Sequence, residues 1–207
     1  MNDMKRPNPL YWSVRALAWM TMHTFLWLSI RNRHKVPKKG GMIVVCNHTS
    51  NIDPVILGIS TPRFVRFMAK AELFQNRWFG VFIRNLGAFP IRRGSSDRSA
   101  IRQALNVTAE GGCLAIFPEG HRSRDGKLGK GMTGAAFLAR KAGCVVVPAA
   151  ISGRYGLFRR ITVRFGEPIQ PVVDTSNEEF MKILMDRIAK LLQEKDKVDT
   201  SEHNLIT

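Results

Sequence analysis

The sequence predicts a single α/β domain with a mixed, mostly parallel sheet flanked by helices, and three observations support this prediction. Short apolar runs typical of buried strands alternate along the chain with segments long enough for helices. No internal repeat or low-complexity linker divides the 207 residues, a length that suits one domain with its own core. Polar residues follow directly on several apolar runs, and strand ends are where open α/β sheets place their ligand chemistry.

Strands are expected at residues 42–46, 64–69, 114–117, 145–151 and 161–165, with a further apolar run ending near Ile91. Helices are expected from Pro54, over about 72–86, from Ser96 or Asp97 to Ala109, over 132–142, and after the Ser176–Glu179 capping box. Apolar groups wrap more than one face of the 72–86 helix, so it is either buried or in contact with lipid.

A tryptophan-rich apolar stretch, residues 11–30, precedes this alternation. About 20 apolar residues are needed to span a bilayer, but Arg15 and His23 interrupt the stretch, which makes spanning unattractive. No small-residue cleavage site follows, so a signal peptide is not indicated. We expect a helix, or a bent pair of helices, lying in the membrane interface; the alternative is an ordinary core helix.

Basic residues at 31–39 follow the stretch and suit anionic headgroups. Interfacial anchors would be the three tryptophans Trp12, Trp19 and Trp27. We therefore divide the chain into a membrane-associating helical segment with its basic cluster (1–39), the main domain (40–195) and a polar tail (196–207). The protein is expected at the cytoplasmic face of a membrane, as a peripheral or monotopic protein.

Composition limits the partners. A formal net charge of +16 indicates an anionic environment, either nucleic acid or a membrane surface. Aromatic residues lie in apolar helices and are not interleaved with basic residues, and no nucleic-acid module signature is present, so no nucleic-acid partner is expected. A non-enzymatic basic domain that binds RNA or membranes remains the competing class. Cys46, Cys113 and Cys144 form no metal or redox spacing, which favours packed thiols in a reducing compartment.

The first candidate for chemistry is the pair His48 and Asp53, which follows the 42–46 run directly. A histidine whose second ring nitrogen is held by a carboxylate is a positioned general base. Taken alone, the pair allows a second interpretation, in which Asp53 caps the helix at Pro54 and His48 merely packs nearby. The chain has no Gly-x-Ser-x-Gly elbow, and residues 120–127 lack the glycine spacing of a phosphate loop.

Three further blocks decide between these interpretations. Asn47-His48-Thr49-Ser50-Asn51-Ile52-Asp53 is followed by Gly87-Ala88-Phe89-Pro90-Ile91-Arg92-Arg93, by Phe117-Pro118-Glu119-Gly120-His121-Arg122-Ser123, and by Val147-Pro148-Ala149-Ala150-Ile151. In this order the blocks resemble the glycerolipid acyltransferases of the 1-acyl-glycerol-3-phosphate acyltransferase type, over positions 47 to 151. One departure is His121, where the family usually has threonine; this substitution could alter pH response or substrate fit.

The resemblance implies acyl transfer from an acyl thioester, on coenzyme A or acyl carrier protein, to the free hydroxyl of 1-acyl-glycerol-3-phosphate, giving phosphatidate. It assigns His48 as the general base and Asp53 as the group that orients it. Another lysolipid or an amino-lipid precursor is the alternative acceptor. No metal and no cofactor beyond this co-substrate are expected. The partners would be the lysolipid, the acyl donor and an anionic phospholipid surface.

Substrate contacts follow from the same resemblance. Arg93 falls on the family's arginine and Arg92 on its variable neighbour, with Arg122 as a second phosphate ligand. Glu119 would accept from an acceptor hydroxyl or orient Arg122, and Gly120 would allow close backbone approach. Lys70 matches a lysine of the family and would add positive charge to the site. For the acyl chain, Trp78, Phe79 and Phe82 could line a dry slot, although plain core packing explains them equally well.

Overall fold

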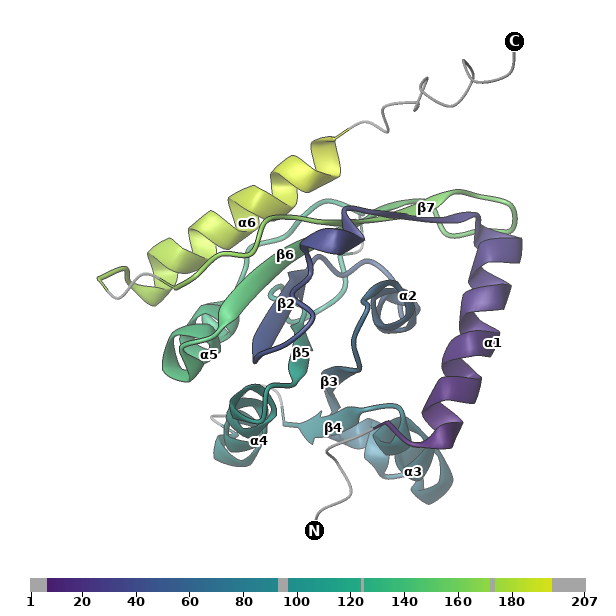
Figure 1. Ribbon diagram of the computed structural model, residues 1–207, viewed down its shortest axis with the longest axis horizontal. Coiled ribbons are helices and arrows are strands. Elements are labelled where there is room, and N and C mark those ends of the chain that lie inside the picture. Colours follow the sequence, from purple (N-terminus) through teal and green to yellow (C-terminus); the bar gives the residue numbers. More distant parts are fainter. Residues whose placement is uncertain (1–6, 93–96, 124, 172–173, 195–207) are drawn as a thin grey trace.

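The computed structural model describes residues 7–92, 97–123, 125–171 and 174–194, which form a seven-stranded sheet with helices on both faces (Figure 1). The strand order is β1-β7-β6-β2-β5-β3-β4. Their bounds are β1 (Leu28–Arg31), β2 (Met42–Cys46), β3 (Val65–Lys70), β4 (Ala88–Ile91), β5 (Cys113–Ile116), β6 (Val145–Gly153) and β7 (Ile161–Phe165). Neighbouring strands are parallel except β6 and β7. The predicted mixed, mostly parallel sheet is confirmed.

Helices cover the two faces of the sheet unequally. Those described are α1 (Pro9–Leu26), α2 (Asp53–Ser60), α3 (Arg77–Asn85), α4 (Arg98–Ala109), α5 (Gly134–Ala142) and α6 (Asn177–Gln193), with short 3-10 turns η1 (Arg33–Lys35) and η2 (Ala71–Phe74). One face packs against α4, α5 and α6, and the other packs against α1 and α2 (Figure 1). Because both faces are covered, all five residues of β2 are buried, which explains its continuous apolar run.

Strand register places the motif blocks next to one another. β2 pairs with β5 on one side and β6 on the other, with Val45 opposite both Ile116 and Pro148. These three strands run in the same direction, so the loops after β2 and β5 leave the sheet at the same edge. The blocks that contain His48 and Glu119 therefore meet at the carboxyl end of the sheet, as the sequence led us to expect.

The N-terminal stretch forms one helix rather than a bent pair. Asn8 caps α1 by accepting from the Tyr11 amide at 2.8 Å, and the helix ends at Trp27, whose φ is 41°. None of the described helices is long and apolar enough to cross a membrane. The guanidinium of Arg15 donates to carbonyls at the end of α2, including those of Ile59 at 2.9 Å and Thr61 at 2.7 Å. The charge that interrupts the apolar run thus fixes α1 to α2.

The expected segment boundary at residue 39 does not coincide with a boundary in the fold. Residues 28–31 form β1, an edge strand that pairs in parallel with β7. Val36 and Leu28 are also buried in the core cluster beneath α1 and α2. The N-terminal segment is therefore part of the folded sheet, because its second half supplies a strand and core side chains.

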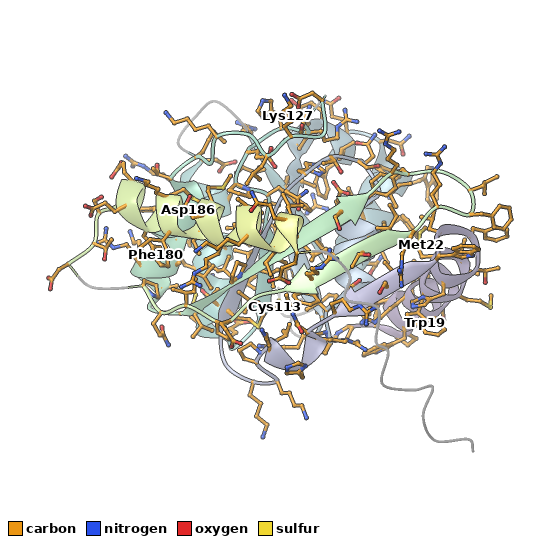
Figure 2. All side chains as sticks on the ribbon, turned by 90° about the horizontal axis from the view of Figure 1, so that it is seen from above. Trp19, Met22, Cys113, Lys127, Phe180 and Asp186 are labelled. Atoms are coloured by element: carbon orange, nitrogen blue, oxygen red, sulfur yellow. The ribbon has the colours of Figure 1, made fainter. Side chains whose placement is uncertain are left out.

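The expected helix over 72–86 is also divided. It breaks into η2 and α3 because Asn76 has extended backbone and its side chain caps α3, accepting from the Phe79 amide at 3.0 Å. The capping box at Ser176 and Glu179 is present as predicted, and it opens α6, whose Phe180 packs on the sheet (Figure 2).

Candidate active site

His48 and Asp53 are in direct contact. The Nδ1 atom of His48 lies 2.8 Å from Oδ2 of Asp53, which is the first residue of α2 and has no exposed surface. The same Oδ2 accepts from the amides of Thr49 at 2.6 Å and Ser50 at 2.7 Å. The loop from β2 to α2 is therefore wrapped around one buried carboxylate. Of the two interpretations that the pair alone allows, the structure agrees with direct contact between His48 and Asp53.

This contact sets which ring nitrogen faces the carboxylate. Oδ2 of Asp53 accepts from two backbone amides and lies against Nδ1 of His48, so Nε2 is the ring nitrogen left to face a substrate. The ring is held from one side by Phe117, whose ring centroid lies 4.2 Å away at an interplanar angle of 20°. With 13% of its side chain exposed, His48 is accessible without being free to rotate. An oriented imidazole with a free Nε2 is suited to proton abstraction.

Glu119 connects the blocks through the main chain. It is 3% exposed, and its Oε1 accepts from the His48 amide while Oε2 accepts from the Gly129 amide, each at 2.8 Å. Arg122 is exposed, and within the described ranges no bond joins it to Glu119. The expectation that Glu119 orients Arg122 is therefore replaced by a different role. Its carboxylate holds the β2–α2 loop against the loop after β5.

Backbone geometry around Gly120 is tight. Gly120 has φ of +71°, and a Cβ on it would lie 2.2 Å from the Cε atom of Met132, so a side chain here would be both strained and crowded. Next to it, His121 is exposed and donates through Nδ1 to the Glu119 carbonyl at 2.7 Å. The amide of Ser123 donates to the His48 carbonyl at 2.7 Å, which adds a second main-chain link between the two blocks.

Two residues of the site were not assigned from the sequence. Asn47, buried at the end of β2, accepts from the Ile151 amide at 2.8 Å and donates to the Ile151 carbonyl at 3.0 Å. The sequence offered one signal for Asn47, which is that it opens the block containing His48 and Asp53. Tyr155, in the loop after β6, donates its hydroxyl to Oδ1 of Asp53. No spacing in the sequence marks Tyr155, because its partner lies 102 residues away.

A cavity of about 580 Å³ opens beside these loops. Its lining is mostly apolar and comes from β3–β5, α4, α5 and the loops after β4 and β5, including Met68, Ile91, Ile101, Ile116, Phe117, Met132, Ala135, Phe137 and Leu138. Glu119, Gly120 and His121 also line it. The aromatic residues expected to form such a slot do not contribute. Trp78, Phe79 and Phe82 are exposed on α3 and do not line this cavity, so they are not core residues.

The candidate phosphate ligands lie around the carboxyl end of the sheet, beside the cavity. Arg92 lines the cavity, its side chain is exposed, and its amide donates to Asp97 at 2.9 Å. Lys70 is exposed at the end of β3, where it pairs in register with Ile91, the residue before Arg92. Arg93, the preferred candidate, lies outside the described residues.

The three thiols are buried, as expected of packed cysteines. Burial raises the pKa of the Cys113 thiol to about 12 and that of Cys144 to about 11, and it also raises the pKa of Cys46. The thiolate is the nucleophilic form, so these groups are poor nucleophiles near neutral pH. Among the residues that the structure describes, no group of three or more His, Cys, Asp or Glu side chains could hold a metal ion.

The fold and these four blocks define an acyltransferase. The chain belongs to the family described as Acyltransferase, whose model matches residues 28–152. It is 33% identical over 149 residues to the 1-acyl-sn-glycerol-3-phosphate acyltransferase of Bacillus subtilis (strain 168), covering 69% of this chain and 73% of that protein. It is 35% identical over 182 residues to the protein of the same name from Streptococcus pneumoniae (strain ATCC BAA-255 / R6), covering 84% of this chain and 67% of that one.

Two other relatives bear on fold and acceptor. The crystal structure of the 1-acyl-sn-glycerophosphate acyltransferase PlsC from Thermotoga maritima matches with a TM-score of 0.74 and 26% identity, covering 87% of this chain and 77% of that one. The lyso-ornithine lipid O-acyltransferase of Pseudomonas aeruginosa (strain PAO1) is 36% identical over 114 residues, covering 55% of this chain and 43% of that protein. The chain is thus an enzyme of the Acyltransferase family, and its relatives are named for the acylation of two different lysolipids.

Proposed function

We propose that this enzyme transfers a fatty acyl group from an acyl thioester, on coenzyme A or acyl carrier protein, to the free hydroxyl of 1-acyl-glycerol-3-phosphate. The product is phosphatidate. The observation that carries the proposal is the His48–Asp53 contact, which turns Nδ1 to the carboxylate and leaves Nε2 of His48 available to a substrate beside an apolar cavity. The names of the two bacterial relatives over most of the chain support the acceptor.

In the proposed reaction, Nε2 of His48 takes the proton of the acceptor hydroxyl as its oxygen attacks the thioester carbonyl. Asp53 stabilises the imidazolium that forms, since its Oδ2 already accepts from Nδ1. The tetrahedral intermediate then collapses, the C–S bond breaks, and the thiolate takes the proton from the imidazolium. The acyl group thus passes directly to the acceptor oxygen and the hydroxyl proton passes through His48 to the thiolate, so no covalent acyl-enzyme is needed. The high pKa of the buried thiols agrees with direct transfer.

The cavity between β4, β5, α4 and α5 is the proposed acyl site. Its mostly apolar lining would keep a hydrocarbon chain out of water, and Phe117 connects it to His48 because the same ring lines the cavity and stacks on the imidazole. Glu119 and Gly120 lie where the cavity meets the loops. An acyl group seated here would present its thioester carbonyl to the edge of the sheet where His48 lies.

Phosphate recognition is proposed for Arg93 and Arg122, with Arg92 and Lys70 adding positive charge at the same edge.

We expect Arg93→Ala and Arg122→Ala each to raise KM for the phosphorylated acceptor by roughly tenfold or more, with less effect on KM for the acyl thioester. Arg93→Lys should also be impaired, because a point charge cannot reproduce the two-pronged guanidinium contact. Steady-state kinetics with each substrate varied in turn measures this. An unchanged acceptor KM in both alanine variants would place the phosphate site elsewhere.

The experiment that tests the function is incubation of the purified enzyme with lysophosphatidate and a labelled acyl thioester, followed by measurement of labelled phosphatidate. A parallel incubation with lyso-ornithine lipid tests the second candidate acceptor, which the Pseudomonas aeruginosa relative supports. Phosphatidate formation with little transfer to the amino-lipid is the expected result. Transfer to neither acceptor, with binding to RNA, would instead support a basic binding domain.

We also propose that the enzyme works on a membrane, at its cytoplasmic face, because its acceptor resides in the bilayer. Support comes from α1, whose outward side chains include Trp12, Trp19 and Met20, while Met22 on the same helix packs against the core (Figure 2). Arg15 holds this helix on α2, so α1 lies along the domain with its apolar side exposed. Such a helix is suited to lie in the interface without crossing it.

A further inference from the structure

Exposed apolar side chains extend well beyond α1. Trp78 is 83% exposed, the largest exposed fraction among the large apolar side chains of the described residues, and Val81 and Phe82 follow it on the same side of α3. Leu157 and Phe158, in the loop between β6 and β7, are 70% and 61% exposed. Exposed apolar patches on a folded domain mark contacts with another protein or with lipid.

The three segments adjoin one another. At the start of α1, the side chain of Asn8 donates to that of Asn85 at the end of α3, at 2.7 Å. At the other end of α1, the amide of Phe158 donates to the carbonyl of Phe25 at 2.7 Å. Figure 1 shows α3 beside one end of α1 and the β6–β7 loop beside the other. Together α1, α3 and residues 153–160 make one surface, which we name the docking surface.

Local folding does not explain the residue choice at Phe158, which lies on the docking surface, or at Trp27, which directly follows α1. Trp27 and Phe158 adopt left-handed backbone, with φ of 41° and 58°, a conformation that glycine or asparagine would accept at lower cost. Both side chains are nevertheless aromatic and more than half exposed. Most of each ring is left in solvent, which indicates a contact outside the chain.

The charge of the docking surface selects the partner. Neither α1, α3 nor residues 153–160 contains Asp or Glu, although the chain has 16 of them. Basic residues such as Arg77, Arg84, Arg154 and Arg159 border the apolar side chains, and Arg84 lies over the ring of Phe74 at 4.7 Å. A symmetric contact with a second copy would place arginine opposite arginine. A surface on which tryptophan is bordered by arginine, and which contains no Asp or Glu, fits an anionic bilayer.

We infer that α3 and the tip of the β6–β7 loop contact lipid alongside α1, so that the docking surface seats the enzyme on an anionic membrane. The inference rests on the proposed membrane location, which α1 alone could provide. It adds two segments outside the N-terminal helix, and it places the loop that carries Tyr155 at the lipid surface.

The test is sedimentation of the full chain with vesicles of phosphatidylcholine containing phosphatidylglycerol. We expect Trp78→Ser/Phe82→Ser and Leu157→Ser/Phe158→Ser each to lower the partition coefficient by about tenfold or more, since each pair removes two large apolar groups. Ile183→Ser is the matched control, because Ile183 is 40% exposed on α6, across the sheet from α1. It should bind like the wild type.

Binding is read without acyl transfer, so the result does not depend on activity. If Trp19→Ser weakened binding while both double variants bound normally, α1 would be the anchor and the inference would be overturned. A wild-type dimer in analytical ultracentrifugation that the α3 double variant abolished, with vesicle binding unchanged, would identify a second copy as the occupant instead.

A different observation concerns the two oxygens of Asp53. Oδ2 accepts from His48 and from two backbone amides, whereas Oδ1 accepts from the Tyr155 hydroxyl. Burial, followed by the contact with Asp53, raises the pKa of that hydroxyl, so it stays a donor. The other titratable groups around the pair are Glu119, bonded to main chain, and the buried Cys46 thiol.

We propose that Tyr155 is a positioning residue for the dyad: its hydroxyl fixes the rotation of the Asp53 carboxylate so that Oδ2 faces His48. The proposal rests on His48 acting as the base. It gives the β6–β7 loop a part in the active site, because only two residues separate Tyr155 from Phe158, whose amide donates to the last turn of α1. No contact of Tyr155 with substrate is needed.

Tyr155→Phe should lower kcat by about tenfold, the loss expected when one hydrogen bond to a charged group is removed, with both KM values within about twofold. The acid limb of the kcat/KM profile should move to higher pH, because a carboxylate with one donor fewer accepts more strongly from the imidazolium. Thr108→Val is the matched control, since the hydroxyl of Thr108 donates to the Leu105 carbonyl within α4 and takes no part in the dyad. It should leave the profile unchanged.

A Tyr155→Phe enzyme with wild-type kcat and a superimposable pH profile would overturn this proposal, even if His48→Ala were inactive. Full activity of His48→Ala would instead remove the base assignment itself. The two failures are therefore distinguishable.

Discussion

Replacing His48 with alanine should lower kcat by roughly two to four orders of magnitude, the usual loss when a general base is removed. The protein should remain folded, because the Asp53 carboxylate keeps the amides of Thr49 and Ser50 and the hydroxyl of Tyr155 as donors. Transfer of labelled acyl groups to lysophosphatidate measures the rate, and circular dichroism with thermal unfolding measures the fold.

His34→Ala supplies the control for this experiment, because His34 lies exposed on η1 and takes no part in the proposed site. Asp53→Asn should be impaired to a similar or lesser extent. An asparagine amide that faced Nδ1 would donate rather than accept, and the imidazole would then adopt the other tautomer. Near-normal turnover by a folded His48→Ala enzyme would show that another group removes the proton.

Glu119→Gln should reduce both stability and turnover. A glutamine can accept from only one of the two amides that Glu119 now serves, and its NH₂ group would face the other, a buried donor left unpaired. Loss of such a charged hydrogen bond costs about 1.5–3 kcal/mol. Because one of the amides belongs to His48, kcat should fall by about tenfold or more as the base shifts.

Urea unfolding and kcat are measured on the same preparation, with Glu72→Gln as the control, since Glu72 is exposed on η2. Stability and kcat should both stay at the wild-type level in the control. If Glu119→Gln kept full stability and raised only the acceptor KM, the carboxylate would be a substrate ligand, as the sequence led us to expect, and not a structural link.

Much of this protein was accessible from local properties of the chain. Apolar runs such as Met42–Cys46 identify buried strands because both faces of the sheet are covered. The capping box at Ser176 identifies the start of α6 because its two hydrogen bonds join residues only three apart. His48 and Asp53 are five residues apart, so their contact is equally local. The four blocks then indicated the family.

What the tertiary structure alone decided depends on residues far apart in the chain. Glu119 meets the His48 amide across 71 residues and Tyr155 meets Asp53 across 102, so neither role leaves a spacing signal in the sequence. Hydropathy also cannot distinguish an apolar side chain that faces the core from one that faces outward. It therefore left Trp78, Phe79 and Phe82 open between burial and lipid contact, and the structure places them on the surface. The cavity forms between strands and helices that the sequence does not place side by side.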